Sequence, residues 1–199
     1  MDIIFDELIS SFVEHKIGLK DAFFPEKLAK DLTFHLQNLY EDNLLRSARI
    51  GSNHLETLDK TIRKDYIYWL DKEHNNEIEN EFFLLIDEFV QYLNRYCYAG
   101  IVDYEFHFAY YEPGSFYKRH VDQFQNNNQR KYTFICYLNE NWQKGDGGEL
   151  NAYLNNETIQ IEPHYNRAVF FKSDEIEHEV LMANKDRLSI TGWFKVTSL

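Results

Sequence analysis

The apolar residues of this chain change their spacing about halfway along it. Before residue 100 they recur every three or four positions, in a stripe of Leu28, Leu32, Leu36 and Leu39 and in a second stripe from Phe82 to Leu93. This spacing predicts two amphipathic helices, the first beginning near Pro25. From about residue 101 the apolar runs are short and are separated by turn residues, which predicts strands.

Seven strand-like runs are expected in the second half. They cover residues 101–111, 132–138, 149–154, 158–162, 167–171, 179–182 and 187–196. Short strands at this spacing are typical of an all-β sandwich or barrel, with the helices packed on one outer face. We therefore predict one α+β domain over residues 1–199, with a mainly helical supporting region at 1–98 and a β core at 99–199.

The charge balance excludes several classes of partner. The chain has 33 acidic and 21 basic residues, a formal net charge of −12, so we expect no nucleic-acid partner and no anionic membrane surface. No signal peptide precedes the first acidic residues and no long apolar segment follows, which predicts a cytoplasmic protein. Cys97 and Cys136 are expected to be buried free thiols of a reducing compartment. The sequence predicts no particular oligomeric state.

Three residues have the types and spacing of a metal site. His120 and Asp122 lie two positions apart, so in a strand their side chains project from the same face. On its own this pair is weak evidence, because His-x-Asp is common by chance and an exposed strand pair explains it better. His178 lies at the start of a later strand, and two imidazoles with one carboxylate form the facial triad of non-haem Fe(II) oxygenases.

Arg187 adds a second part to this pattern. If Ala183–Asp186 closes a hairpin, Arg187 and Thr191 share a face with His178, and Arg187 lies on the order of 13 Å from it. A five-carbon diacid that chelates the metal would present its far carboxylate to a guanidinium at that place. Without the three metal-type residues, a solvated strand arginine would explain Arg187 as well.

These residues resemble a known family. The motifs are His120-x-Asp122, His178 and the run from Arg187 to Phe194, in matching order and spacing over about residues 60 to 196. They are similar to the 2-oxoglutarate- and Fe(II)-dependent dioxygenases. The similarity is greatest to the prolyl 4-hydroxylase-like branch, which includes the oxygen-sensing prolyl hydroxylases and their bacterial counterparts. The resemblance implies a double-stranded β-helix, a jelly-roll or cupin-like core, over residues 99–199.

The resemblance also implies roles for individual residues. His120, Asp122 and His178 would bind Fe(II), and Arg187 would hold the distal carboxylate of the cosubstrate 2-oxoglutarate with Tyr137 and Thr191. Tyr111 would lie near the metal, and the substrate pocket would include Tyr117, Trp193, Arg63 and Asp65. Packing or a loop ion pair would explain these last four equally well. By the same resemblance, dioxygen would be a co-substrate, and ascorbate would be a further candidate cofactor. His107 and His164 are expected to be structural or surface histidines.

The expected activity is hydroxylation of a prolyl residue in a protein or peptide, with release of succinate and carbon dioxide. The same chemistry on another peptide residue or on a small molecule is one alternative. A non-catalytic binding protein that responds to iron or oxygen is another. The negative charge predicts that a polypeptide substrate has basic residues around the modified position.

Overall fold

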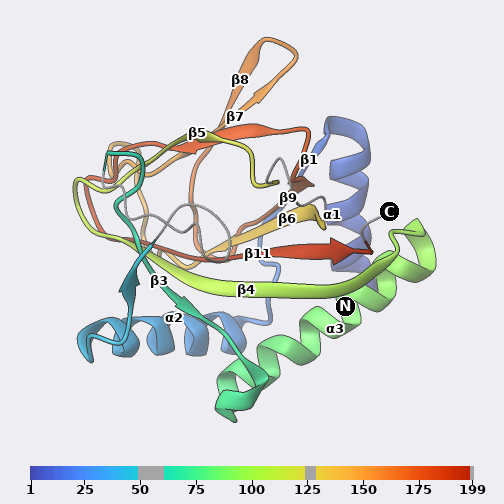
Figure 1. Ribbon diagram of the computed structural model, residues 1–199, viewed down its shortest axis with the longest axis horizontal. Helices are drawn as coiled ribbons and strands as arrows, with labels where there is room; N and C mark the ends of the chain where they lie inside the picture. The colour runs from blue at the N-terminus through green and yellow to red at the C-terminus, as the bar shows by residue number, and fades with distance from the viewer. Residues whose placement is uncertain (49–60, 124–128, 198–199) are drawn as a thin grey trace.

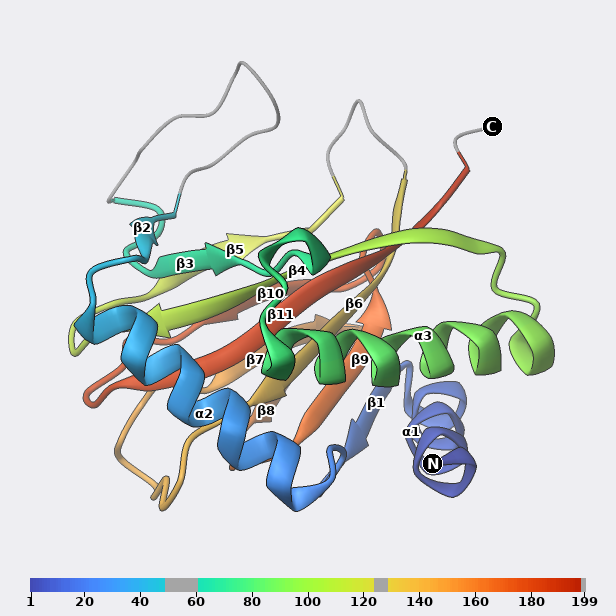
Figure 2. The ribbon, with the colours of Figure 1, turned by 90° about the horizontal axis from the view of Figure 1, so that it is seen from below.

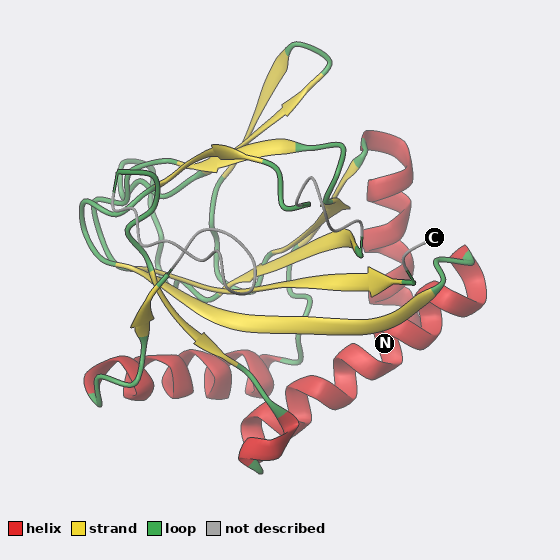
Figure 3. Cartoon of the chain, viewed as in Figure 1, coloured by secondary structure: helices red, strands yellow, loops and turns green. Residues whose placement is uncertain are grey.

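The chain folds into three layers, with helices on one side of a large sheet and a small sheet on the other (Figures 1 and 2). The computed structural model describes residues 1–48, 61–123 and 129–197. Its helices are α1 (Asp2–His15), α2 (Glu26–Glu41), the 3-10 helix η2 (Lys72–His74) and α3 (Glu77–Cys97). Figure 3 shows that the strands gather on one side of α2 and α3. Among the described residues, no helix is both long and apolar enough to cross a bilayer.

Two antiparallel sheets form the β part of the molecule. The large sheet has the order β1 (Ile17–Lys20), β9 (Ala168–Lys172), β6 (Arg130–Tyr137), β11 (Arg187–Val196), β4 (Ile101–Tyr111), β3 (Tyr66–Trp69) and β2 (Arg46–Ser47). The small sheet has the order β5 (Tyr117–His120), β10 (Glu177–Val180), β7 (Leu150–Leu154) and β8 (Glu157–Ile161). From β4 to β11 the chain crosses repeatedly between the two sheets, so the expected double-stranded β-helix is confirmed.

The main hydrophobic core lies between the large sheet and the helices. Phe82 and Phe89 of α3 pack against Phe106 of β4 and Phe134 of β6, with ring centroids 5.2 Å apart for Phe82 and Phe106 and 6.2 Å apart for Phe89 and Phe134. All four side chains are fully buried. Burial of each such ring stabilises the fold by roughly 1.5–3 kcal/mol, so this layer fixes the large sheet as a rigid platform.

The other face of the large sheet forms the interior of the β-helix. Successive residues of a strand point to opposite faces, and Phe106 and Phe108 of β4 belong to the helix-side core. Ala109 and Tyr111 instead belong to a second apolar cluster, shared with β7 and β10 of the small sheet. His107 has the same parity as these two residues. The odd-numbered side chains from His107 to Tyr111 therefore line the space between the sheets.

The structure extends and corrects the expectations from the sequence. The two predicted helices and the seven predicted strands are present, and β4 and β11 have the predicted bounds. Helix α1 and the strands β1, β2, β3 and β5 were not expected. Cys136 is buried as predicted, but Cys97 is exposed, so the prediction for Cys97 was wrong.

The predicted hairpin between the strand of His178 and the strand of Arg187 is wrong. Strand β10 pairs with β5 and β7, whereas β11 pairs with β4 and β6 in the other sheet. The segment that connects β10 to β11 does not form a hairpin turn. Its backbone amides donate hydrogen bonds to other loops instead. The Asn184 amide donates to the Asp146 carbonyl (2.7 Å), and the Ala183 amide donates to the Ser115 carbonyl (2.9 Å). His178 and Arg187 thus come from opposite sheets.

Candidate active site

His120, Asp122 and His178 meet between the two sheets. His178 of β10 pairs directly with His120 at the end of β5, and Asp122 follows two residues later. The Nε2 atom of His120 lies 3.5 Å from Oδ1 of Asp122, and Nε2 of His178 lies 3.5 Å from Oδ2. One ligand atom from each residue lies within 4.8 Å of the other two. Two imidazoles and a carboxylate at these distances can reach a single cation.

Backbone carbonyls hold the two imidazoles in the tautomer that a metal needs. Nδ1 of His120 lies 2.8 Å from the Lys118 carbonyl oxygen, and Nδ1 of His178 lies 3.2 Å from that of Ile176. A carbonyl only accepts, so each Nδ1 bears the proton and each Nε2 offers a lone pair toward Asp122. Burial lowers the pKa of His178 to about 4, which keeps its ring neutral at neutral pH.

The Asp122 carboxylate is kept ionised by its neighbours. Burial acts to raise its pKa, but His178, His120 and a hydrogen bond from Thr133 hold the pKa well below its usual range. The Thr133 hydroxyl donates to Oδ2 at 2.7 Å, and it also lies 2.9 Å from the Ser173 hydroxyl. A carboxylate beside two imidazoles is the donor set of a site for Fe(II).

Arg187 is a buried cation at the start of β11. Its side chain is 3% exposed, its Nε donates to the Gly148 carbonyl (2.8 Å) and its Nη1 donates to the Ser189 hydroxyl (3.1 Å). Within the described residues, no carboxylate forms an ion pair with it. A buried charge without a counterion is costly, so this guanidinium is suited to an anionic ligand.

Tyr137 and Gly148 complete the surroundings of Arg187. The Tyr137 hydroxyl is buried and has no partner at hydrogen-bonding geometry among the described residues, and the Tyr137 ring lies 5.0 Å from the guanidinium carbon. At Gly148 the backbone has φ +76°, and a Cβ would lie 2.8 Å from Cδ of Arg187. Only glycine leaves room for the arginine there. A carboxylate beside Arg187 would also accept a bond from Tyr137.

Two further predicted site residues lie on the same interior face. Tyr111 of β4 pairs with Arg187, and the guanidinium carbon lies 4.8 Å from its ring. Burial raises the pKa of Tyr111, so its hydroxyl remains protonated. Thr191 lies on the same face of β11 as Arg187, paired with His107 on one side and Ile135 on the other. The structure thus places Tyr111 beside the arginine.

Three of the four remaining predicted residues lie beside His120. The Tyr117 ring stacks on His120, with centroids 3.6 Å apart. Arg63 lies over Tyr117 (4.3 Å from its guanidinium carbon to the ring centroid), and its Nε donates to buried Asp65 at 2.8 Å. Trp193 lies apart from these three, on β11. Arg63 and Asp65 form the ion pair that was one of the interpretations of these two residues from the sequence. This pair lies close to the candidate metal ligand His120, with the Tyr117 ring between them.

Some residues of the site were missed from the sequence. Thr133, Ser173 and Ser189 are fully buried polar residues that bond to Asp122, to each other or to Arg187. Alternation along the predicted strand 132–138 puts Thr133 on the same face as Tyr137, and that signal would have found it. His107 is buried inside the β-helix, whereas His164 lies near the surface, 2.9 Å from Glu162.

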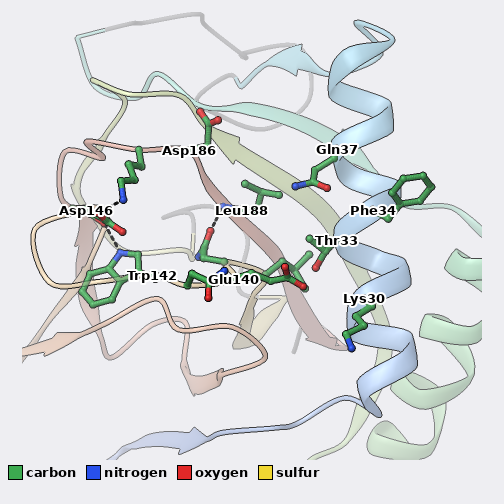
Figure 4. A pocket seen from close by; sticks show the side chains of 14 residues that line it. Lys30, Thr33, Phe34, Gln37, Glu140, Trp142, Asp146, Asp186 and Leu188 are labelled. Carbon is green, nitrogen blue, oxygen red and sulfur yellow. Dashed lines mark hydrogen bonds and ion pairs between the residues drawn. The ribbon is translucent and has the colours of Figure 1, made fainter.

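A separate pocket of about 470 Å³ opens on the helix side of the large sheet (Figure 4). It lies between α2, which contributes Lys30 and Phe34, and the loops that contain Trp142 and Asp146. Leu188 lines it, and Leu188 and Arg187 are successive strand residues that point to opposite faces. This pocket is therefore distinct from the interior that holds the three metal-type residues.

Comparison with protein families gives a match to this part of the chain. The family model described as the 2OG-Fe(II) oxygenase superfamily matches residues 106–195. Among curated proteins, the chain is 25% identical over 213 residues to prolyl 3-hydroxylase OGFOD1 of Mus musculus. It is 37% identical over 81 residues to the Xenopus laevis protein of the same name. The matches cover 100% and 35% of this chain but only 34% and 16% of those proteins, so the chain spans about a third of their length or less.

Solved structures match over almost the whole chain. A prolyl-4-hydroxylase of Pseudomonas putida is 32% identical, with a TM-score of 0.87, covering 98% of this chain and 100% of that one. A prolyl hydroxylase of Trichoplax adhaerens, solved with a peptide fragment of the hypoxia inducible factor oxygen degradation domain, is 23% identical. Its TM-score is 0.85, and the match covers 98% of this chain and 90% of that one. The second likeness supports the fold.

Proposed function

This chain belongs to the 2OG-Fe(II) oxygenase superfamily, and from that premise we propose that it hydroxylates a prolyl residue of a protein or peptide. The reaction consumes 2-oxoglutarate and dioxygen and yields hydroxyproline, succinate and carbon dioxide. The observation that supports this most is the pairing, inside one β-helix, of a His-Asp-His cluster with a buried arginine that has no anionic partner among the described residues. Each part has an obvious ligand: the cluster suits Fe(II), and Arg187 suits a dicarboxylate.

Each residue then has a role in holding a reactant. His120, Asp122 and His178 bind Fe(II). Arg187 binds the distal carboxylate of the cosubstrate through the donors it does not use for Gly148 and Ser189, and Tyr137 donates a further hydrogen bond to it. The other residues line two neighbouring sites: Thr191 and Tyr111 line the cosubstrate site, and Tyr117, Trp193, Arg63 and Asp65 line the substrate pocket.

The protein contributes orientation and exclusion of water. When bound, Fe(II) supplies the oxidising chemistry that converts a prolyl C–H bond into C–OH as 2-oxoglutarate loses carbon dioxide. The buried Tyr137 and Arg187 keep solvent from the cosubstrate, and the carbonyls of Lys118 and Ile176 fix the imidazoles. Ascorbate is proposed only as an external reductant for the iron, and the cytoplasmic location remains a prediction.

A prolyl residue in a polypeptide is the proposed target because the relatives bear that activity in their names. The Pseudomonas putida protein is a prolyl-4-hydroxylase, the mouse protein is a prolyl 3-hydroxylase, and the Trichoplax adhaerens enzyme was solved with a peptide. The charge of −12 favours a target segment with basic residues. The position hydroxylated on the ring distinguishes the two named activities, and mass spectrometry with authentic 3- and 4-hydroxyproline standards identifies it.

The test is succinate release by the purified protein. With Fe(II), 2-oxoglutarate and a protein extract, wild type is expected to form succinate and a +16 Da modification on proline, and His178→Ala is expected to lose both metal binding and turnover. The exposed Tyr98→Ala variant is the matched control and keeps both. Absence of cosubstrate turnover together with unchanged metal binding in His178→Ala would refute the proposal.

Other outcomes point to the alternatives. A +16 Da modification on another residue, or succinate formed only with small molecules, retains the chemistry and changes the substrate. Tight binding of Fe(II) and 2-oxoglutarate without any turnover identifies a non-catalytic protein that responds to iron or oxygen.

A further inference from the structure

Asn139 lies where β6 leaves the large sheet, beside the first residues of β11. The two strands pair in register as far as Tyr137 and Ser189. Leu138 and Leu188 follow as the next pair, and the Leu138 amide donates to the Leu188 carbonyl at 3.0 Å. In a regular antiparallel ladder the Leu188 amide would donate back to Leu138. It donates instead to Oδ1 of the Asn139 side chain, at 2.6 Å.

Both halves of the Asn139 amide group are used, so the orientation of this side chain is fixed. The residue is 7% exposed, and its Nδ2 donates to the Pro163 carbonyl at 2.8 Å. A backbone N–H only donates and a backbone carbonyl only accepts, so the side-chain oxygen must face Leu188 and the nitrogen must face Pro163. Asn139 therefore ties the start of β11 to the segment between β8 and β9.

The residue that Asn139 holds is the direct neighbour of Arg187. On one side Arg187 pairs with Tyr111 of β4, and its Nε donates to the Gly148 carbonyl at 2.8 Å. On the other side, the register of β6 and β11 would place Asn139 itself opposite Arg187, but β6 ends at residue 137. The Asn139 side chain therefore holds, through Leu188, the edge of β11 at which the backbone pairing stops.

The position of this backbone matters because Arg187 is suited to bind a carboxylate through two parallel hydrogen bonds. A planar guanidinium binds in this way only when its plane and its distance match the ligand. Loss of the Asn139 oxygen would take the partner from a buried amide next to Arg187, which is costly, and the chain would shift to recover a bond. A shift of about 1 Å at a binding group can reduce its effect on the order of a hundredfold.

We propose that Asn139 is a positioning residue for the cosubstrate: by holding the Leu188 amide it fixes the backbone from which Arg187 reaches the distal carboxylate of 2-oxoglutarate. This inference rests on the function proposed above. Asn139 and Leu188 both line the separate pocket on the helix side of the sheet (Figure 4), so Asn139 acts through the backbone and not by contact with the cosubstrate. The metal-type residues lie on β5, on β10 and in the loop after β5, so Asn139 does not position them.

Asn94 of α3 provides a matched control. Its side chain makes the same two kinds of bond to the start of a strand: Nδ2 donates to the Ile101 carbonyl, and Oδ1 accepts from the Ile101 amide, both at 2.8 Å. Ile101 is the first residue of β4, at the opposite end of that strand from Tyr111. Asn94→Ala therefore removes two comparable hydrogen bonds and leaves the start of β11 unchanged.

The first measurement is binding without turnover, by calorimetry with Zn(II) in place of Fe(II). Asn139→Ala is expected to raise the Kd for 2-oxoglutarate about tenfold, because Arg187 is displaced. Asn94→Ala is expected to stay within about twofold of wild type, although both variants should have a lower Tm. The Kd for Zn(II) should change less than about twofold in either variant, because the metal-type residues keep their hydrogen bonds.

Two further variants separate positioning from stability. Asn139→Asp keeps an oxygen for the Leu188 amide and loses the donor to Pro163, so it is expected to recover most of the affinity for 2-oxoglutarate while its Tm stays low. Asn139→Ser ends one bond short of the Asn139 oxygen and is expected to bind like Asn139→Ala. It provides a second variant without the Leu188 bond should Asn139→Ala not fold.

Kinetics with Fe(II) and a protein extract provide a second readout. The concentration of 2-oxoglutarate that gives half the maximal rate of succinate release is expected to rise about tenfold in Asn139→Ala. The maximal rate at saturating cosubstrate should change less than about twofold, whereas a purely structural role would lower the Tm or the maximal rate and leave that concentration unchanged.

Three results overturn the inference. They are a Kd for 2-oxoglutarate in the folded Asn139→Ala or Asn139→Ser variant equal to that of wild type, an equal loss of affinity in Asn94→Ala, and an Asn139→Asp variant that binds as weakly as Asn139→Ala. If wild type itself binds no 2-oxoglutarate with the metal present, it is the proposed function that fails, and the inference fails with it.

Discussion

At the scale of single residues, the candidate site depends on side chains that touch no ligand. The Thr133 hydroxyl donates to Asp122 at 2.7 Å and is itself held by Ser173 at 2.9 Å. Residues that orient a metal ligand in this way commonly change metal affinity 10- to 100-fold when they are replaced. The hydrogen bond also leaves one carboxylate oxygen, Oδ1, free of Thr133 and directed toward the imidazole of His120.

Thr133→Val keeps the shape of the side chain and removes this hydrogen bond. We expect it to weaken Fe(II) binding about tenfold, because the carboxylate loses the group that orients it. Titration of the metal-free protein with Fe(II) under argon, followed by calorimetry, measures the change. Thr158→Val, on the exposed β8, is the control and should bind like wild type. Equal affinities for Thr133→Val and wild type would contradict a role for Thr133 in holding Asp122.

At the scale of the element, the close approach of β11 and β4 determines where the interior residues lie. Gly192 of β11 pairs with Phe106 of β4, and the Phe106 ring covers the glycine. A Cβ at position 192 would lie 2.1 Å from Cδ1 of Phe106 and 2.5 Å from the Glu105 carbonyl oxygen. The ring can move, but a carbonyl of the adjacent strand cannot move without disturbing the sheet.

Gly192→Ala is therefore expected to lower the free energy of unfolding by about 1–3 kcal/mol, the usual cost of overpacking a core. For a chain of this size that corresponds to a fall in Tm of roughly 2–4 °C for each kcal/mol. Urea denaturation measures the first quantity and calorimetry the second. Thr158→Ala on an exposed strand is expected to stay within about 0.5 kcal/mol of wild type. A Gly192→Ala variant as stable as wild type would be incompatible with this packing.

The helices are joined to each other by a buried carboxylate. Glu79 of α3 lies 3.0 Å from Nε2 of His35 in α2 and 2.9 Å from Nδ1 of His74 in η2, and it accepts a bond from the Asp71 amide at 3.2 Å. Burial acts to raise the pKa of Glu79, but the bonds to His35, His74 and Asp71 outweigh it and lower the pKa below the usual 4.5. The ionised form is the one that the fold stabilises.

This pKa shift predicts a pH dependence. Because the folded pKa is depressed, the contribution of Glu79 is fully present above about pH 4.5 and is lost as the pH falls through the folded pKa. Glu79→Gln is expected to cost about 2 kcal/mol at pH 7, and this difference from wild type should shrink below pH 4.5. Urea denaturation at pH 7 and pH 4 measures both values. Glu81→Gln, on the exposed side of α3, is the control. A difference that stays constant with pH would contradict the assignment.

At the scale of the whole molecule, the sequence contained the positions of the seven predicted strands but not their pairing. Strands β4 and β11 have the predicted bounds because their apolar runs are long and end in turn residues. The hairpin with β10 was wrong because the choice of partner depends on contacts distant in sequence, such as that between Asn184 and Asp146. His120, Asp122 and His178 were predicted from residue type, spacing and the family resemblance, and the structure brings the three side chains together. The bond from Thr133 and the stack of His107 on Trp193 require the register across strands.

The residues of the candidate site are divided between the two sheets, and this division predicts that ligands stabilise the whole fold. The three metal-type residues lie on β5, β10 and the loop after β5, whereas Arg187 and Tyr137 belong to the large sheet. A metal and a cosubstrate that bridge these groups tie the two sheets together. Because both ligands bind the folded chain and not the unfolded one, they stabilise it by mass action.

Fe(II) and 2-oxoglutarate, each at about a hundred times its Kd, are therefore expected to raise Tm. A single ligand at that ratio stabilises by about 2.7 kcal/mol, which for a chain of this size is roughly 5–10 °C. Calorimetry under argon measures the shift, and a chelator should reverse it. Arg187→Gln is expected to keep the increase due to the metal and lose the increase due to 2-oxoglutarate, whereas His178→Ala should lose the metal increase. If 2-oxoglutarate stabilises Arg187→Gln as much as wild type, its distal carboxylate is bound elsewhere, and the two sheets are not bridged through Arg187.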